Sequence, residues 1–257
     1  MSLDERGGVA VVTGASRGLG AAIAKRLASE GMAVACAATS VENAEPVAAE
    51  LRAQFGVAAL AVQMLVEDRD SVEAALSLVE QELGPISVMV NNAGVASVTT
   101  FLDMAEADFD RVMDINVKGV FNGAQAAARR MVASGTSGSI VNLGSIAGVN
   151  AFPLRMGYST SKAAVHQMTK IMALDLAEHQ IRVNCVAPGY IRTDMVQDII
   201  DAGTLDEARL MSRVPLGDLG TVEDIAAAVS WVASAEARYV TGAVMVIDGG
   251  WSAYGHI

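Results

Sequence analysis

The sequence is poor in cysteine, histidine and aromatic residues. Its 257 residues include two cysteines and three histidines, and aromatic residues make up 4%. His166, His179 and His256 lack the spacing of a metal-ligand set, so we predict no metal site. Cys36 and Cys185 each lie in an apolar run, which favours buried thiols over a disulfide. This cysteine usage predicts a cytoplasmic protein.

Long hydrophobic runs and an excess of basic residues are also absent. No apolar run reaches the ~18 residues of a membrane span, and residues 9–12 are too few for a signal-peptide core. The net charge of −11 opposes nucleic acid and anionic membranes as partners. With 52% hydrophobic and 18% charged residues, the chain can bury a sizeable core. We see no repeat or linker and predict one domain over residues 1–257.

A glycine-rich turn follows the first apolar run. Residues 9–12 read Val-Ala-Val-Val, which is typical of a buried parallel strand, and residues 21–30 have the pattern of a helix. Thr-Gly-Ala-Ser-Arg-Gly-Leu-Gly lies between them. Glycines let the backbone approach a pyrophosphate, and a helix N-terminus offers it free N–H groups. In this context we predict a dinucleotide site, whereas a lone glycine cluster would indicate only a turn.

Tyr158 and Lys162 are four residues apart in a helix predicted over residues 157–178, so they lie on one helical face. A lysine ammonium close to a phenol stabilises the phenolate, which allows a tyrosine to exchange protons near neutral pH. The same spacing is common on exposed helices, where it has no function. The other motifs of the chain favour the catalytic interpretation.

Five groups of residues together resemble a known family. In order, they are the Thr-Gly-x-x-x-Gly-x-Gly turn, Asn-Asn-Ala-Gly at 91–94, Asn116 within a helix, Ser145 thirteen residues before Tyr158, and Pro-Gly at 188–189. From residue 9 to residue 251 the chain resembles the short-chain dehydrogenase/reductase family. The resemblance implies an α/β protein with a single-domain Rossmann fold. It also implies a doubly wound, seven-stranded parallel sheet with helices on both faces, and a homotetramer.

The resemblance further implies four catalytic residues: Asn116, Ser145, Tyr158 and Lys162. Tyr158 would protonate a carbonyl oxygen as hydride reaches the carbon, and Ser145 would donate a hydrogen bond to that oxygen. Lys162 would bind the nicotinamide ribose. Asn116 would widen its helix and hold a water that relays protons to the lysine. The implied reaction is hydride transfer between NADP(H) and a ketone or secondary alcohol.

The residues that follow the second predicted strand distinguish NADP(H) from NAD(H), because they lie beside the adenosine ribose. An acidic residue there would bind the ribose hydroxyls of NAD, but the chain has no acid before Glu42. Arg17, Thr39 and Ser40 offer a cation and two hydroxyls, which suit a 2′-phosphate. This ending resembles that of NADPH-dependent 3-oxoacyl-carrier-protein reductases. NAD(H) remains the alternative, with Arg17 solvated and Ser40 only a helix cap.

The remaining cofactor contacts are implied by the family. Its members carry Asp or Asn after the third strand, but this chain has Leu65, so we expect a backbone group near Val66 to bind adenine. The predicted cofactor-binding residues are Gly14, Ser16, Arg17, Gly18, Leu19, Gly20, Thr39, Ser40, Leu65, Val66, Asn92, Ala93, Gly94, Tyr158, Lys162, Pro188, Gly189, Ile191 and Thr193.

The sequence also predicts the elements that surround the substrate. Residues 146–157 should form a pocket wall that is mainly apolar, with Asn150 and Arg155 as its strong polar groups. A lid is predicted at about 190–220, because a long irregular stretch in a compact domain is usually a lid. The apolar tail, residues 251–257, suggests packing on another subunit.

The acidic charge of the chain bears on the substrate. Reductases that act on the acidic acyl carrier protein need basic patches, but this chain has Thr-Ser-Gly at 136–138 and Glu-His-Gln at 178–180. We therefore predict a small-molecule substrate, namely a ketone, hydroxyacyl compound or sugar-type alcohol. The alternatives are a 3-oxoacyl-carrier-protein reductase and an NAD-dependent polyol or sugar dehydrogenase. A non-catalytic scaffold is also conceivable, but the intact set of four catalytic residues argues against it.

Overall fold

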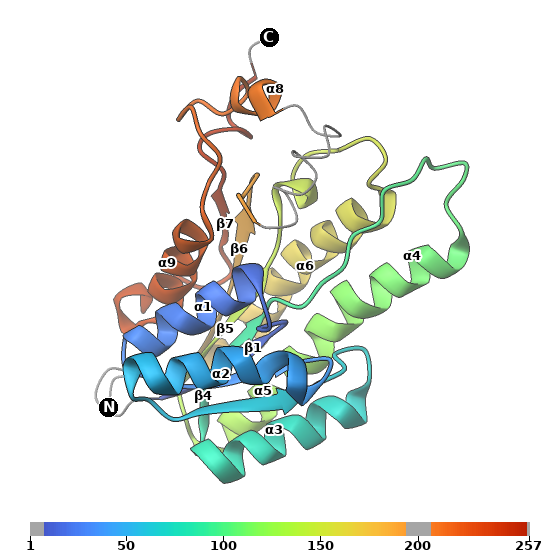
Figure 1. Ribbon diagram of the computed structural model, residues 1–257. Coiled ribbons are helices and arrows are strands. Elements are labelled where there is room, and N and C mark those ends of the chain that lie inside the picture. Colours follow the sequence, from blue (N-terminus) through green and yellow to red (C-terminus); the bar gives the residue numbers. More distant parts are fainter. Residues whose placement is uncertain (1–7, 194–206, 256–257) are drawn as a thin grey trace.

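The computed structural model describes residues 8–193 and 207–255 (Figure 1). Its strands pair in parallel in one seven-stranded sheet of order β3-β2-β1-β4-β5-β6-β7. The strands are β1 (Val9–Thr13), β2 (Ala33–Ala38), β3 (Ala59–Gln63), β4 (Ile86–Asn91), β5 (Gly138–Leu143), β6 (Ile181–Pro188) and β7 (Val244–Ile247). The helices are α1 (Gly18–Ser29), α2 (Val41–Phe55), α3 (Arg69–Leu83), α4 (Glu106–Met113), α5 (Gly119–Ser134), α6 (Met156–Asp175), α8 (Glu207–Met211) and α9 (Val222–Ala233). The predicted doubly wound parallel sheet is confirmed.

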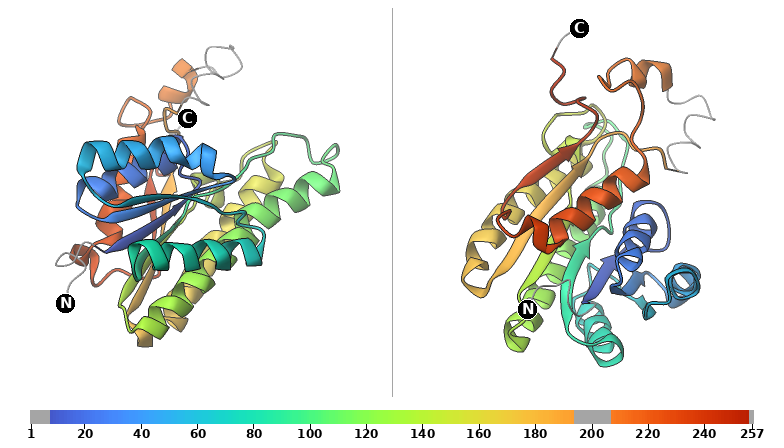
Figure 2. Two further views of the ribbon diagram at one scale, coloured as in Figure 1. Left: turned by 60° about the horizontal axis from the view of Figure 1, so that its bottom comes forward. Right: turned by 90° about the vertical axis from the view of Figure 1, so that its left-hand side faces the viewer.

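Two helical layers cover the two faces of the sheet (Figure 2). Strand side chains alternate between the faces, so Val12 and Cys36 pack with α1, α2 and α9, whereas Val11 and Ala35 pack with α3 and α5. Both faces are therefore apolar. This explains why the strands read as continuous hydrophobic runs rather than alternating ones.

The order of the strands places a crevice at the middle of the sheet. The chain winds outward from β1 to β3 and then returns to β4, which pairs with β1 on its other side. The loops after β1 and β4 leave in opposite directions at the carboxyl edge. In open α/β sheets this switch point is where ligands bind.

One long helical segment is widened in its middle. The helices α4 and α5 are joined without a break by a π-helical turn, Asp114–Lys118, which contains Asn116. The family resemblance implied that Asn116 widens its helix, and the helix is widened there. A π turn inserts an extra residue into the helix and often marks a functional site.

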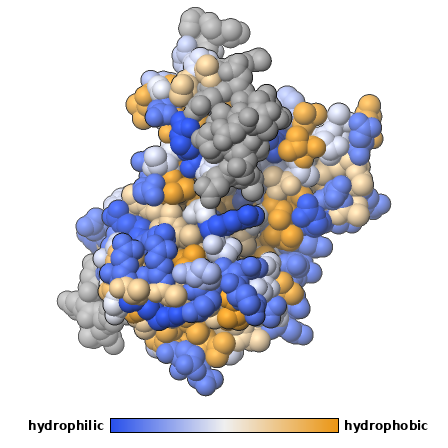
Figure 3. All heavy atoms as spheres, viewed as in Figure 1, coloured by the Kyte–Doolittle hydropathy of each residue, from blue (hydrophilic) through white to orange (hydrophobic). Residues whose placement is uncertain are grey.

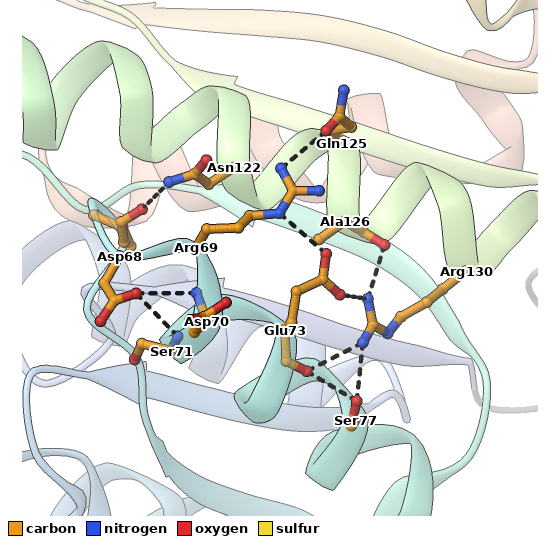
Figure 4. A network of polar contacts seen from close by, with 11 residues as sticks. Asp68, Arg69, Asp70, Ser71, Glu73, Ser77, Asn122, Gln125, Ala126 and Arg130 are labelled. Carbon is orange, nitrogen blue, oxygen red and sulfur yellow. Dashed lines mark hydrogen bonds and ion pairs between the residues drawn. The ribbon is translucent and has the colours of Figure 1, made fainter.

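Charged residues connect α3 to α5 on the surface of the molecule (Figure 4). Arg130 pairs with Glu73 (2.6 Å) and Glu80 (3.1 Å), and Arg69 pairs with Glu73 (3.2 Å). The hydrogen bond from Arg130, the main cause, holds the pKa of Glu73 below its usual value. Several partly exposed pairs that share partners stabilise more than isolated surface pairs do.

Apolar side chains are exposed on the projection formed by α4 and the loop before it, at the right of Figures 1 and 3. They include Val98, Phe101 and Leu102.

Within the described part of the chain, no helix is long and apolar enough to cross a membrane. Both cysteines are buried and unpaired, as predicted. Much of the predicted lid, residues 194–206, lies outside the described residues, and α8 begins directly after it.

Candidate active site

The turn after β1 requires glycine because some of its residues have a left-handed backbone and another packs closely on neighbouring backbone. Gly14 and Gly18 have φ values of 64° and 55°, which favour glycine. A Cβ on Gly20 would lie 2.1 Å from the carbonyl oxygen of Gly14, so the turn can close only with glycine there. A Cβ on Gly18 would meet nothing within 4 Å, because this position faces open space. The turn thus presents bare backbone on its outer side.

The start of α1 fits an anionic group. Its N-cap residue, Arg17, makes no side-chain capping hydrogen bond, and the first turn contains no acidic residue. The helices α2, α3 and α9, by contrast, are capped by Ser40, Asp68 and Thr221. The first N–H groups of α1 need acceptors, and the helix dipole favours an anion there. The glycine turn and α1 together suit the pyrophosphate of a dinucleotide.

Asn92 holds the inner side of the same turn. Its Nδ2 donates to the carbonyls of Thr13 (2.8 Å) and Gly14 (3.2 Å), and its backbone N–H donates to Thr13 Oγ1 (2.9 Å). Ala93 N–H donates to the same hydroxyl (2.9 Å). Asn92, predicted as a cofactor-binding residue, therefore also has a structural role. These bonds join the ends of β1 and β4 across the crevice.

The predicted 2′-phosphate residues come from two turns, the one after β1 and the one after β2. Arg17, in the first, is exposed. Ser40 Oγ accepts from the Asn43 N–H (3.3 Å) and so caps α2. Hydrogen bonds from its own backbone N–H and from Ser40 keep the pKa of Glu42 below its usual value, so this carboxylate stays ionised beside the hydroxyl. Thr39 is exposed beside them.

Leu65 and Val66 follow β3 and are already engaged by the protein. The Leu65 N–H donates to Ser71 Oγ (3.0 Å), and the Val66 carbonyl accepts from Asn122 Nδ2 (2.9 Å). The Val66 side chain packs on α5, where a Cβ on Gly119 would approach it to 2.7 Å. The predicted adenine contact thus lies on a rigid segment, and its carbonyl already has a donor.

Asn116 is held in the π turn by both ends of its side-chain amide. Its Oδ1 accepts from the Val95 N–H (2.8 Å), and its Nδ2 donates to the Val95 carbonyl (2.9 Å) and to Ser161 Oγ (3.0 Å). A Cβ on Gly94 would lie 3.2 Å from this Oδ1 and 3.7 Å from Lys162 Nζ. Asn116 therefore connects the loop after β4 to helix α6 and lies beside the lysine.

Lys162 and Tyr158 lie in the first two turns of α6. Lys162 is 5% exposed, and its Nζ donates to the Leu143 carbonyl (2.8 Å) and lies 5.7 Å from the centre of the Tyr158 ring. Ser161 Oγ donates to the Tyr158 carbonyl (2.7 Å) while it accepts from Asn116. These contacts position the ammonium near the phenol, in the arrangement that the four-residue spacing predicts.

Ser145 lies just beyond the end of β5 and is nearly buried. Its Oγ accepts from the Ala147 N–H (3.1 Å), which leaves its own O–H proton available for another acceptor. The imidazole of His166 packs closely against this turn. A Cβ on Gly144 would lie 2.4 Å from the imidazole, and a Cβ on Gly148 would lie 2.6 Å from it. Burial, with the nearby charges of Lys162 and Lys170, lowers the pKa of His166. We refer to Asn116, Ser145, Tyr158 and Lys162 as the catalytic floor.

The Pro-Gly segment after β6 is fixed to its neighbours. The Gly189 N–H donates to the Ile247 carbonyl (2.8 Å), and a Cβ on Gly189 would lie 2.6 Å from Asp248 Cβ. Ile191 is buried and bridges to Gly220. Pro188 ends β6, and Thr193 is the last described residue before the gap. The predicted nicotinamide contacts thus lie at the carboxyl edge, beside β5 and β7.

Three aromatic rings line the outer side of the site. Phe152 stacks on Trp251 (5.2 Å between ring centres), and Tyr190 meets both rings edge-on (6.5 and 6.0 Å). We call these three residues the aromatic wall. Sequence reasoning placed Phe152 in the pocket but missed the part played by Tyr190. The tail, residues 251–257, was predicted to pack on another subunit, and its first residue, Trp251, contacts Phe152 of its own chain. No local motif indicates these contacts, since the rings come from three separate loops.

Comparison with known proteins agrees with this geometry. The family description "short chain dehydrogenase" matches residues 8–203. The chain is 42% identical over 242 residues to 3-oxoacyl-[acyl-carrier-protein] reductase FabG of Staphylococcus aureus (94% of this chain, 96% of the relative). It is 40% identical over 248 residues to 2-(R)-hydroxypropyl-CoM dehydrogenase of Xanthobacter autotrophicus (95% and 98%). A solved gluconate 5-dehydrogenase from Burkholderia cenocepacia, in complex with NADP and tartrate, superposes with a TM-score of 0.91 at 34% identity and 96% coverage of both chains.

The fold, the site and these matches define an oxidoreductase with a Rossmann fold. The chain belongs to the short-chain dehydrogenase/reductase family. The family resemblance inferred from the sequence is therefore confirmed. The roles of individual site residues remain predictions.

Proposed function

We propose that the protein is an NADP(H)-dependent oxidoreductase that interconverts a small ketone and the corresponding secondary alcohol. The observation that carries the proposal is the catalytic floor. Asn116, Lys162 and Tyr158 are joined through hydrogen bonds and close contacts at the carboxyl edge of β4 and β5, next to Ser145. Such a constellation of a proton donor, a cation and a hydroxyl at this edge suits carbonyl reduction.

Each floor residue has a role in the proposed reaction. Bound NADPH supplies the hydride that reduces the carbonyl carbon. Ser145 donates its free O–H to the carbonyl oxygen and orients it. Tyr158 gives its hydroxyl proton to the same oxygen, so that the C=O bond becomes C–OH. Lys162 favours the resulting phenolate by its charge and holds the nicotinamide ribose, and Asn116 supports the return of a proton through water.

The glycine turn would hold the cofactor's pyrophosphate at the start of α1, and Arg17, Thr39 and Ser40 would bind its 2′-phosphate. The solved relative that contains NADP supports a nicotinamide cofactor of this kind. Glu42 opposes a 2′-phosphate, because its ionised carboxylate lies beside Ser40. This carboxylate favours a second candidate, an NAD(H)-dependent alcohol dehydrogenase.

The decisive experiment titrates NADPH and NADH separately against the wild type and Arg17→Ala. We expect NADPH to bind more tightly than NADH and the variant to lose about 10-fold in NADPH affinity, since a charge-assisted contact to phosphate contributes about 1.5–3 kcal/mol. NADH affinity should change little. Equal or tighter binding of NADH by the wild type would reject the NADP(H) assignment and favour the second candidate.

We further propose a homotetramer of single-domain subunits with a lid over residues 190–220. Exposed apolar side chains on α5 and α6 support association through these helices. They are Phe121, Val132, Ile171 and Leu174. Light scattering after size-exclusion chromatography would measure the mass. A monomeric mass of 26.6 kDa would contradict the assembly.

A further inference from the structure

The aromatic wall closes the outer side of the site with residues from three strand ends. Phe152 belongs to the loop that connects Ser145 to α6, Tyr190 follows β6, and Trp251 follows β7. The side chain of Asn150 donates to Ser252 Oγ (3.1 Å), and this bond ties the first loop to the third. The wall thus faces the same carboxyl edge as the catalytic floor. Stacked and edge-on rings offer a rigid apolar surface to a ligand.

Two arginines are placed against this wall. The guanidinium of Arg213 lies over the Trp251 ring, with Cζ 4.9 Å from the ring centre. Arg155 is the N-cap residue of α6, one helical turn before Tyr158. Burial raises the pKa of the Tyr190 hydroxyl, and the charges of Arg155 and Arg213 act in the opposite direction. Arg213 thus lies on the wall itself, and Arg155 ends the loop that carries Phe152.

The backbone before Arg155 is held in an unusual conformation. Leu154 has a φ of 63°, and its carbonyl accepts from the Thr99 N–H (3.1 Å). A left-handed backbone is unfavourable at a leucine, so surrounding contacts must maintain it. This conformation brings the chain from the wall into the first turn of α6. It fixes the point from which the Arg155 side chain extends.

Neither arginine has an acidic partner among the described residues. Arg192 pairs with Asp218 (3.3 Å), and the half-buried Arg182 donates to four backbone carbonyls. Among the described residues, by contrast, Arg213 contacts the indole and the Tyr254 carbonyl (3.5 Å), and the Arg155 side chain makes no hydrogen bond or ion pair. In a chain of net charge −11, two cations without acidic partners in this part of the described structure are unexpected. Their charges remain available to a ligand.

We propose that the substrate carries a compact anionic group, a carboxylate, sulfonate or phosphate, which Arg155 and Arg213 bind while the carbonyl meets Ser145 and Tyr158. The aromatic wall would pack against the short apolar chain between the two groups. Guanidinium groups suit such anions because their N–H donors match the anionic oxygens. Arg155 is the main anchor, since it is half-buried and adjacent to the catalytic helix, whereas Arg213 is exposed and attracts the anion at the mouth. The proposal rests on the ketone reduction proposed above and specifies its substrate class.

The test compares matched acid and ester substrates. Reduction of 4-oxopentanoate and 5-oxohexanoate is measured beside that of their methyl esters, with saturating cofactor, in the wild type, Arg155→Gln, Arg155→Lys and Arg213→Gln. Arg129→Gln is the control, because Arg129 is an exposed arginine near the C-terminal end of α5, and its loss changes the net charge equally. Pentanoate, pentanesulfonate and butyl phosphate are then compared as competitive inhibitors, which identifies the preferred anion.

We expect wild-type kcat/KM to be about 10- to 100-fold higher for the acids than for the esters, since hydrogen bonds between charged groups contribute about 1.5–3 kcal/mol. Arg155→Gln should remove most of this preference through KM and leave the esters unaffected. Arg155→Lys should restore part of it, Arg213→Gln should lose less, and Arg129→Gln should lose nothing.

Two results would overturn the inference without touching the proposed ketone reduction. One is that the wild type reduces the esters as fast as the acids, in which case the proposed ketone reduction stands and only the anionic substrate class fails. The other is that Arg129→Gln loses the preference as fully as Arg155→Gln, which would indicate a general effect of net charge. If the wild type turned over neither the acids and esters nor a panel of neutral ketones and alcohols, the proposed function would fail and the inference with it.

Discussion

The catalytic floor and the aromatic wall lie at the same edge of the sheet but are held in different ways. In the floor, Asn116 is fully buried, and three hydrogen bonds tie it to a neighbouring loop and helix. In the wall, Trp251 is held mainly by ring contacts, and the arginine over it is exposed. Hydrogen bonds fix both distance and direction, whereas ring contacts tolerate small shifts.

This difference corresponds to two tasks in the proposed reaction. Proton transfer requires reacting groups within hydrogen-bond reach of each other, so the floor must be rigid. Substrate selection requires a surface of suitable shape and charge, and such a surface can vary without loss of the chemistry. Variants of the two regions should therefore differ in the kinetic constant that they change.

The largest effect is expected for Tyr158→Phe. Loss of the phenol proton should lower kcat by about 100- to 10,000-fold, the usual contribution of general acid catalysis. The cofactor dissociation constant should stay unchanged, because the ring remains in place. Steady-state kinetics and a fluorescence titration measure the two quantities. Turnover close to that of the wild type would contradict the role of Tyr158.

A smaller effect is expected for Asn116→Ala. The variant leaves the Val95 N–H and carbonyl without partners, which should lower the free energy of unfolding by about 1–3 kcal/mol. We expect kcat to fall as well, by about 10-fold or more, because the loop beside Lys162 loosens. Asn184→Ala is the matched control, since buried Asn184 also bonds to backbone at both ends of its amide, with Val240 and Ala243.

Chemical denaturation and kinetics of both asparagine variants separate stability from catalysis. Equal losses of stability with a loss of kcat only in Asn116→Ala would confirm that the floor differs from ordinary buried structure. Equal kcat in both variants would mean that Asn116 has only a structural role.

Trp251→Ala should act mainly on KM. The change removes the surface on which Arg213 rests and the ring stacked on Phe152, and a cation–π contact at an exposed site contributes about 0.5–1 kcal/mol. We therefore expect KM for an anionic ketone to rise by about 2- to 5-fold with kcat nearly unchanged. A kcat loss as large as that of Asn116→Ala would show that the wall, too, controls the chemistry.

The smallest effect is expected for His166, which packs against the turn that carries Ser145, and it concerns the pH dependence of stability. The pKa of His166 is lowered in the folded protein, chiefly by burial, so the unfolded chain binds a proton first as the pH falls. Stability should therefore decrease as the pH drops below about 6.5, the usual value for histidine, and should be insensitive to His166 above it. His166→Gln should lack this part of the pH dependence, as urea denaturation between pH 5 and 8 would measure. A difference between the two proteins that is constant over this range would reject the assignment.

The fold was predictable from the family resemblance, and local patterns agree with it. Apolar runs of about five residues alternate with helical segments, and this alternation favours a parallel sheet. The glycine turn was also predictable, because its residues are adjacent in sequence and need backbone conformations that glycine adopts readily. Asn116 stood out for a similar reason, since asparagine is a poor choice in the middle of an apolar helix.

Other features were not predictable from local patterns. A backbone group near Val66 was predicted to bind adenine, but no local pattern showed that the Val66 carbonyl accepts from Asn122 on a distant helix. Glu42 was passed over, yet it lies beside Ser40 with its charge retained. The sequence also carried no sign that Trp251, the first residue of the tail, stacks on Phe152.

By itself, the sequence determined the order of strands and helices, the glycine turn and the spacing of Ser145, Tyr158 and Lys162. Each of these depends on residues that are near neighbours, whose periodicity and conformational preferences act locally. Only the tertiary structure decided which distant loops meet: Asn116 with Val95 and Ser161, and the aromatic wall with its arginines. Such contacts depend on how the strand ends converge at one edge of the sheet, which no local pattern encodes.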